Sequence, residues 1–549
     1  MLLVLYWMLM AACFFLTGFG ALRTVSLSDS GSESTKGLPD TSIFTVIWLG
    51  AAVFTGLVQY LSLLGGIDRG MRLSVVCLLA LYALIDRSAI RAFVSTKLSD
   101  SKRVLLPGFV VLIALLLFTI THASQGPHDY DMGLYHALAV NWVDEYGSVP
   151  GLGNLHSRLA FNFSLFPLAA FFDFWTFDQK VFHLICSFFF LLVGFYLLLS
   201  PFNWLLGDKR VFHLFNILVL IPLFDESSQH LASIQPNYIS LLLSVFIISQ
   251  VLQLMESEER LPAILYISAI VLYAVTIKLH MLPYLLIPIV CSALHWRELL
   301  AKRKVLFMSV MLLLIVLPWM IRGVLISGWL LYPIHHLDLF SFDWKIPAIN
   351  LKSQVDWTTA WAFVSGTYPD EVLASGIFNL VQNWYARNSS HTLLIWLRYS
   401  FAASFIISVL FIKYYRRYMY YLLLLQSVMV LGLILWVTKA PDFRFGVSYL
   451  IPGIALFVTC AMLLPFKSIS VPRLVGLIGV PVLAIGVAIE LGGRIDWSQV
   501  LSSDYSGYRE IETEEYTYPS GLTIRIPRQD RGDQCWAASL LCNPGHWVY

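Results

Sequence analysis

A polar segment at residues 126–164, GPHDYDMGLYHALAVNWVDEYGSVPGLGNLHSRLAFNFS, carries most of the side chains that can do chemistry. Asp129 and Asp131 lie two positions apart, at the start of a helix that the spacing of Leu134 and Leu138 predicts. Two interpretations are open. Either acid can cap the helix N-terminus, or a carboxylate partly withdrawn from water can act as general base toward an acceptor hydroxyl.

Histidines and one arginine accompany these acids. The planar guanidinium of Arg158 suits a phosphate group, and residues 161–175, which follow it, are an aromatic stretch expected at the membrane interface. His128, His136 and His156 can tune the acid or hold a phosphate. Each of them can equally be a structural histidine that is hydrogen-bonded to backbone. We therefore take His136, His156 and Arg158 as candidate substrate-binding residues.

Three further cations lie within or beside apolar segments: Lys278 in TIKLHMLP, Arg322 in WMIRG and Arg444 in KAPDFRFG. A charge in such a place pairs with a partner, lines a cavity or extends to the headgroups. We expect the three to approach Asp131 and bind substrate, although Asp442 can pair with Arg444 locally. The sequence requires no cofactor. A divalent metal stays possible, but the Asp and His spacing fits no strong ligand motif.

Two of the seven cysteines differ from the rest. Cys535 and Cys542 lie in the polar stretch QCWAASLLCNPG, which predicts a small disulfide loop if this tail is outside the cytosol. No second Cys or His pair completes a four-ligand metal site there. The other five lie in apolar runs, where cysteine is a small buried hydrophobe.

The composition indicates which elements must position these residues. The chain is 58% hydrophobic and 13% charged, with a mean hydropathy of +0.73, so lipid must be its solvent. We predict an all-α polytopic membrane protein with about fourteen transmembrane helices, whose first run is a retained anchor. The net charge of +2 gives no indication of a nucleic-acid partner. The predicted spans are 2–22, 44–64, 73–93, 104–122, 181–199, 211–224, 238–254, 263–277, 282–294, 305–321, 392–412, 418–437, 447–464 and 471–489.

Basic residues set the predicted orientation, because Lys and Arg gather on connections of the same parity and mark the cytoplasmic face. Every long polar stretch except 23–42, a flexible linker in this interpretation, then lies on the opposite, exoplasmic face. The predicted division of the chain is transmembrane helices at 1–123, an exoplasmic loop with the acidic motif and an interfacial helix at 124–180, transmembrane helices at 181–322, an exoplasmic loop at 323–391, transmembrane helices at 392–490 and an exoplasmic tail at 491–549.

The chain resembles the GT-C superfamily of polyprenyl-phosphate-sugar glycosyltransferases in its many spans, its acidic motif in an early exoplasmic loop and the aromatic stretch after it. More narrowly, YDMGLYH, VPGLGNLHSRLAFN, APDFRFG and GDQCWAASLLCNPG resemble an uncharacterised group of bacterial polytopic membrane proteins. The resemblance implies Asp131 as catalytic acid, Asp129 as second candidate, and Arg158, Arg322 and Arg444 as ligands of the donor phosphate.

The leading hypothesis is a bacterial inner-membrane glycosyltransferase with a periplasmic active site. It would move a sugar from a polyprenyl-phosphate carrier to a glycan, lipid or protein acceptor of the envelope, with inversion at the anomeric carbon. A polysaccharide polymerase or O-antigen-ligase-like enzyme is the alternative, since the loop at 323–391 supplies His335, His336, Arg387 and His391. A lipid-linked glycan transporter or flippase is the third hypothesis, which predicts midplane charges and an inverted repeat.

Overall fold

The computed structural model of the chain is mostly helical, with one small β-hairpin. Predictions that concern His128, the central part of the linker at 23–42 and the span at 471–489 lie outside the residues it describes. The structure describes residues 2–26, 41–100, 105–127, 129–173, 181–208, 210–257, 260–300, 302–410, 419–462, 511–518, 521–528, 533–536, 538, 540 and 542–543.

The α-helices are α1 Leu2–Ser26, α2 Ile43–Leu64, α3 Arg69–Ile85, α4 Arg87–Asp100, α5 Leu105–Ala123, α6 Ala137–Tyr146, α7 Leu165–Phe171, α8 Ile185–Leu205, α9 Val211–Ser227, α10 Pro236–Glu256, α11 Leu261–Ile277, α12 Leu286–Leu294, α13 Trp296–Leu299, α14 Lys302–Met311, α15 Leu317–Ser327, α16 Ala348–Phe363, α17 Pro369–Leu373, α18 Ile377–Asn388, α19 Thr392–Leu410, α21 Met419–Lys439 and α22 Phe443–Met462. The 3₁₀ and π segments are η3 Met132–His136, η4 Leu152–Asn154, η5 Ser157–Ala160, η6 Phe182–Leu184, η7 Leu279–Leu285 and η8 Leu312–Val316. The strands are β1 Thr513–Thr517 and β2 Thr523–Pro527.

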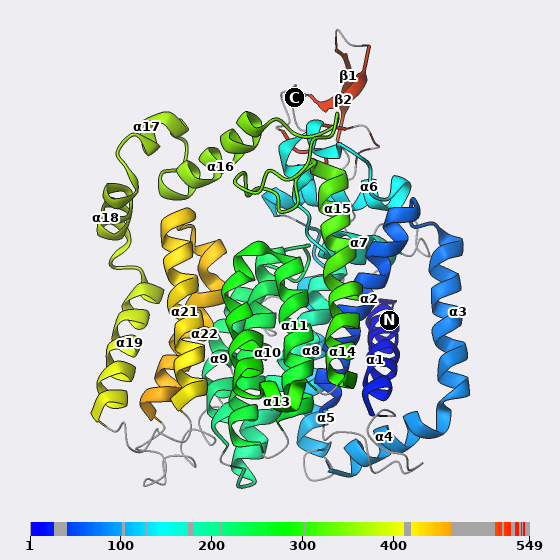
Figure 1. The fold of residues 1–549 in the computed structure, drawn as a ribbon, viewed down its shortest axis with the longest axis vertical. Helices are drawn as coiled ribbons and strands as arrows, with labels where there is room; N and C mark the ends of the chain where they lie inside the picture. The colour runs from blue at the N-terminus through cyan, green and yellow to red at the C-terminus, as the bar shows by residue number, and fades with distance from the viewer. Residues whose placement is uncertain are drawn as a thin grey trace.

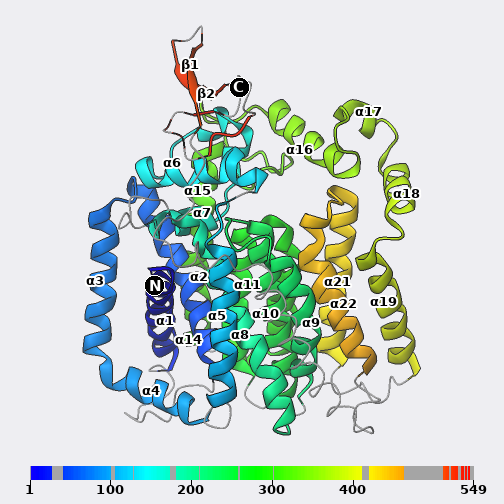
Figure 2. The same ribbon diagram turned by 180° about the vertical axis from the view of Figure 1, so that it is seen from behind.

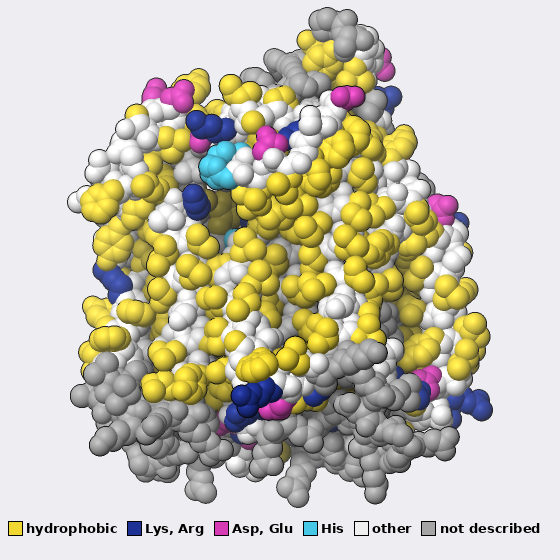
Figure 3. All heavy atoms as spheres, in the orientation of Figure 1, with side chains coloured by type: hydrophobic (Ala, Val, Ile, Leu, Met, Phe, Trp, Pro, Cys, Tyr) yellow, Lys and Arg dark blue, Asp and Glu magenta, His cyan; other side chains and the backbone are white. Residues whose placement is uncertain are grey.

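Seven helices in the described ranges are long and apolar enough to cross a membrane, and four shorter apolar helices accompany them. Most of them run side by side between an upper end with α6 and α16 and a lower end with α4 and α13 (Figures 1 and 2). Apolar side chains cover the middle of the face in Figure 3, and charged ones gather mainly toward the two ends. This is an all-α polytopic membrane protein.

One predicted span divides in two. The run at 73–93 becomes α3 and α4, which are bent by 79° at their junction. Asp86 lies at this junction, where its carboxylate forms an ion pair with Arg23 and accepts a hydrogen bond from Tyr82 at 3.3 Å. A charged residue with fixed polar partners ends the apolar run, so α4 turns along the lower end of the molecule (Figure 1).

The first two helices pack with their backbones in close contact. An added Cβ at Gly18 would lie 1.9 Å from the carbonyl oxygen of Val46, and one at Gly50 would lie 1.7 Å from that of Phe14. Such glycines let transmembrane helices approach more closely than any side chain allows. The absence of a side chain at Gly18 and Gly50 therefore allows α1 and α2 to pack at this short distance.

The upper end differs from the prediction in two ways. The segment at 323–391 is not a simple loop, because it contains α16, α17 and α18, which lie across the top (Figures 1 and 2). The aromatic stretch expected at the interface forms α7, whose seven side chains are all buried. Phe171 of this helix packs edge-on against Phe54 of α2 at 5.0 Å between ring centroids.

Candidate functional site

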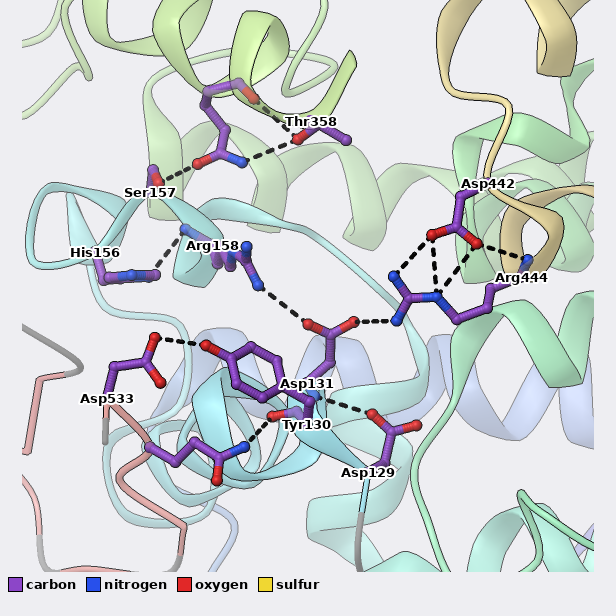
Figure 4. A network of polar contacts seen from close by, with 12 residues as sticks. Asp129, Tyr130, Asp131, His156, Ser157, Arg158, Thr358, Asp442, Arg444 and Asp533 are labelled. Carbon is purple, nitrogen blue, oxygen red and sulfur yellow. Dashed lines mark hydrogen bonds and ion pairs between the residues drawn. The ribbon is translucent and has the colours of Figure 1, made fainter. Parts of the chain in front are cut away.

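Asp131 lies between two arginines that come from distant parts of the chain (Figure 4). One carboxylate oxygen accepts a hydrogen bond from Nη1 of Arg158 at 3.0 Å, and the other lies 3.9 Å from Nη1 of Arg444. Arg444 also binds both oxygens of Asp442, at 2.9 Å to the nearer one. The local Asp442–Arg444 pair expected from the sequence therefore exists, yet it leaves Arg444 facing Asp131.

The backbone around Asp131 is held by Asp129. The Oδ1 atom of Asp129 accepts the backbone N–H of Asp131 at 2.9 Å, and its Oδ2 accepts a bond from the amide of Gln235. Asp131 itself makes no capping bond, so the helix-cap interpretation of its side chain is wrong. The helix that follows opens with one π turn, η3. Turns of this kind are rare in proteins, and many of those that occur lie at functional sites.

Lys278 approaches the same network from the break between α11 and η7. Its ammonium donates to the side-chain oxygen of Asn237 and lies 4.5 Å from the ring centroid of Phe445, the neighbour of Arg444. Burial lowers the pKa of Lys278 to about 8, while the charge of Asp131 acts in the opposite direction. The amine is thus charged at neutral pH and close to losing that charge.

The two described candidate histidines are mainly neutral; His136 is buried and His156 is partly buried. Burial, reinforced by the Arg158 cation, lowers the pKa of His156 to about 4, and its Nδ1 accepts the backbone N–H of Arg158 at 3.3 Å. Burial also lowers the pKa of His136, which packs against the ring of Phe166 at 5.5 Å between centroids. A neutral His156 supplies no cation to a phosphate, so its role here is to shape the turn that carries Arg158.

Arg322 does not join this network. It is buried, and its guanidinium donates to the side-chain oxygen of Asn162, whose own amide and carbonyl exchange hydrogen bonds with the backbone and indole of Trp319. Among the described residues Arg322 forms no ion pair. The sequence places it correctly at the upper end of a span, but its side chain ties α15 to the segment that follows Arg158.

A C-terminal segment also reaches the acidic motif. The hydroxyl of Tyr130 donates to Asp533 at 2.6 Å, and these two residues face each other in Figure 4. Burial, together with the hydrogen bond to Asp533, raises the pKa of Tyr130 to about 12. Cys535 and Cys542, just beyond, form a disulfide. Sequence reasoning assigned Tyr130 and Asp533 no role, and the only available signal was the shared compartment predicted for both segments.

The molecular surface is hollowed toward its upper end. Figure 3 shows an opening below α16, on the side of α21 and α22, with acidic, basic and histidine side chains along its upper rim. The segment at 323–391 returns to this region, because His391 stacks on Phe443 at 3.7 Å between ring centroids. Within the described ranges no group of three or more His, Cys, Asp or Glu side chains is arranged to hold a metal ion.

The structure therefore brings Asp129, Asp131, Arg158, Lys278 and Arg444 together and leaves Arg322 apart. A family model described as "Domain of unknown function (DUF8201)" matches residues 1–451, which include all of these residues. No curated protein and no solved structure matches the chain.

Proposed function

The chain belongs to this family, and from that premise we propose that it is a membrane glycosyltransferase. It takes a sugar from a polyprenyl-phosphate donor and transfers it to an acceptor hydroxyl of an envelope glycan, lipid or protein. The observation that carries the proposal is Asp131, a mostly buried carboxylate between two arginines and beside Lys278. The opening in Figure 3 lies on the side of α22, whose first turn carries Arg444. An acid among cations suits a reaction that needs a base and releases a phosphate.

The reaction balances with these groups. Asp131 accepts the proton of the acceptor hydroxyl as its oxygen attacks the anomeric carbon, and the bond from that carbon to the phosphate oxygen breaks. The electron pair leaves with the polyprenyl phosphate, whose added negative charge Arg158, Arg444 and Lys278 neutralise. Direct displacement of this kind inverts the anomeric centre.

The two contacts of Asp131 differ in a way that suits this division of roles. Arg158 holds one oxygen at 3.0 Å, whereas the contact of Arg444 with the other is looser, at 3.9 Å. The looser oxygen is the one able to take a proton. Arg444 is 48% exposed and is therefore free to turn toward an incoming phosphate.

The substitution Asp131→Asn tests the assignment. Purified protein is incubated with polyprenyl-phosphate-linked sugars and an envelope extract, and released polyprenyl phosphate is measured. Loss of the general base should lower the rate about 100-fold or more, while the protein remains monodisperse. Asp370→Asn, at an exposed acid in α17, is the matched control and should keep the wild-type rate. Full activity of Asp131→Asn would contradict the proposed role.

The location of the reaction is part of the proposal: a bacterial inner membrane, with the site facing the periplasm. The polymerase or ligase alternative draws on His391, which contacts the residue before Arg444. That alternative predicts an oligosaccharide on the donor, so the same assay with single-sugar and oligosaccharide donors separates the two. A flippase would move the donor from one leaflet of a vesicle membrane to the other and would release no polyprenyl phosphate.

A further inference from the structure

The C-terminal segment contacts the acidic motif at consecutive points around the Cys535–Cys542 disulfide. Its described residues here, 533–536, 538, 540 and 542–543, are called the disulfide-closed loop. Besides the Tyr130–Asp533 contact, the Gln534 amide donates to the backbone carbonyl of Tyr130 at 2.9 Å. The backbone N–H of Trp536 donates to the carbonyl of Gly133 at 2.8 Å. Three successive contacts thus follow the chain on both sides of Asp131.

The Trp536 ring fits against Gly133 because that residue has no side chain. A Cβ added at Gly133 would lie 2.5 Å from Cε2 of the indole, closer than real Cβ atoms approach any atom. Trp536 is only 2% exposed, and its Nε1 donates to Gln534 at 3.1 Å. A large ring is therefore fixed in a notch two residues beyond Asp131.

The same loop is fixed at its far end. The side chain of Asn543 donates to the carbonyl of Leu155 at 2.8 Å, and its backbone N–H donates to Arg525 of β2 at 2.8 Å. Leu155 lies just before His156 and Arg158. The loop consequently spans both segments whose side chains form the Asp131–Arg158 ion pair.

We propose that this disulfide-closed loop is a positioning element, which holds the π turn so that the Asp131 carboxylate faces Arg158 and Arg444. Trp536 and Gly133 are its positioning residues. A single π turn has little stability of its own, since its carbonyls have shifted partners. Closing the loop with a disulfide reduces the entropy that docking would otherwise cost. The inference rests on the proposed role of Asp131 for its kinetic part only.

Hydrogen exchange of the full chain in detergent tests the docking without reference to activity. The peptide covering 129–137 should exchange about tenfold faster or more in Trp536→Ala than in the wild type, because local opening is no longer opposed. Trp536→Phe keeps a ring in the notch and should restore most of the protection. Equal exchange in wild type and Trp536→Ala would overturn the inference.

A double-mutant cycle makes the test specific. Gly133→Ala should accelerate exchange as Trp536→Ala does, because its methyl group displaces the indole. The methyl should add no further acceleration in the Trp536→Ala background, where the space is already empty. Additive accelerations would show that the two residues act separately and would contradict the proposal.

Kinetics then tests the positioning role. In the polyprenyl-phosphate release assay, Trp536→Ala and Cys535→Ser/Cys542→Ser should lower kcat about tenfold or more with KM for the donor little changed, since the base is misplaced but the cations remain. Cys77→Ser, at an exposed free cysteine, should leave both constants unchanged. A wild-type kcat in Trp536→Ala overturns the inference. If the wild type itself releases no polyprenyl phosphate, the proposed function fails, and the exchange cycle decides the docking alone.

Discussion

Asp131 and its cations form a nearly balanced group of charges. Three carboxylates, Asp129, Asp131 and Asp442, face Arg158, Arg444 and Lys278 within one network. A phosphate that enters must compete with the carboxylates for the cations, and Arg444 can be reached from solvent because its side chain is 48% exposed. The movement of Arg444 would also remove its looser contact from the Asp131 oxygen that is proposed to take the proton, while Arg158 still holds the other oxygen.

The charge of Lys278 predicts the alkaline limit of activity. Because burial lowers its pKa to about 8, the amine is protonated below that pH and neutral above it. Asp131, Asp442 and Arg444 are the charged groups that act on it. Polyprenyl phosphate release should therefore fall as the pH rises through about 8. Lys278→Arg should keep activity to higher pH, since a guanidinium stays charged.

The pH profile of initial rate at saturating donor is the measurement for this prediction. Lys345→Arg, at a lysine paired with Asp338 in the segment between α15 and α16, is the matched control and should leave the profile unchanged. Identical alkaline limits for the wild type and Lys278→Arg would show that another group sets the limit.

At the scale of elements, the glycine contact of α1 with α2 predicts a position-specific loss of stability. Gly18→Ala places a methyl group against the Val46 carbonyl, where the backbones must separate, and overpacking of this kind costs about 1–3 kcal/mol. The apparent Tm in detergent should fall by several degrees. Gly20→Ala, in the same helix, meets only Tyr82 at 3.6 Å and should not lower it. Equal Tm values for the two variants would contradict the close contact.

Sequence predicted the elements well where one physical effect dominates. Apolar runs of span length in the described ranges became helices, because a backbone in lipid must satisfy its hydrogen bonds within its own segment. The described parts of the long polar stretches lie at the upper end (Figure 1). The bend at Asp86 and the burial of α7 were not predictable from hydropathy, since both depend on partners in other helices. Arg322 shows the remaining limit. Its position along the span follows from the sequence, but the direction in which its side chain points, toward Asn162, depends on the rotation of α15 about its axis.

At the scale of the whole molecule, the proposed orientation predicts which residues react with a reagent added outside the cell. In a Cys77→Ser background, a cysteine at position 370 in α17 should react with a membrane-impermeant maleimide in intact cells. A cysteine at position 297 in α13, at the other end, should react only after lysis. Both positions are exposed, so the comparison depends on the membrane alone. The reverse pattern would place Asp131 on the cytoplasmic side.

The contact between the C-terminal loop and the acidic motif also bears on biosynthesis. Tyr130 and Gln534 are 404 residues apart, and a ribosome adding about 5–20 residues per second needs roughly 20–80 s to make that interval. During this time the early helices can insert while the loop that touches Gly133 does not yet exist. A newly made chain would therefore be embedded in the membrane with its π turn not yet held by the loop, so full activity would come only after the C-terminal loop has been made and has docked.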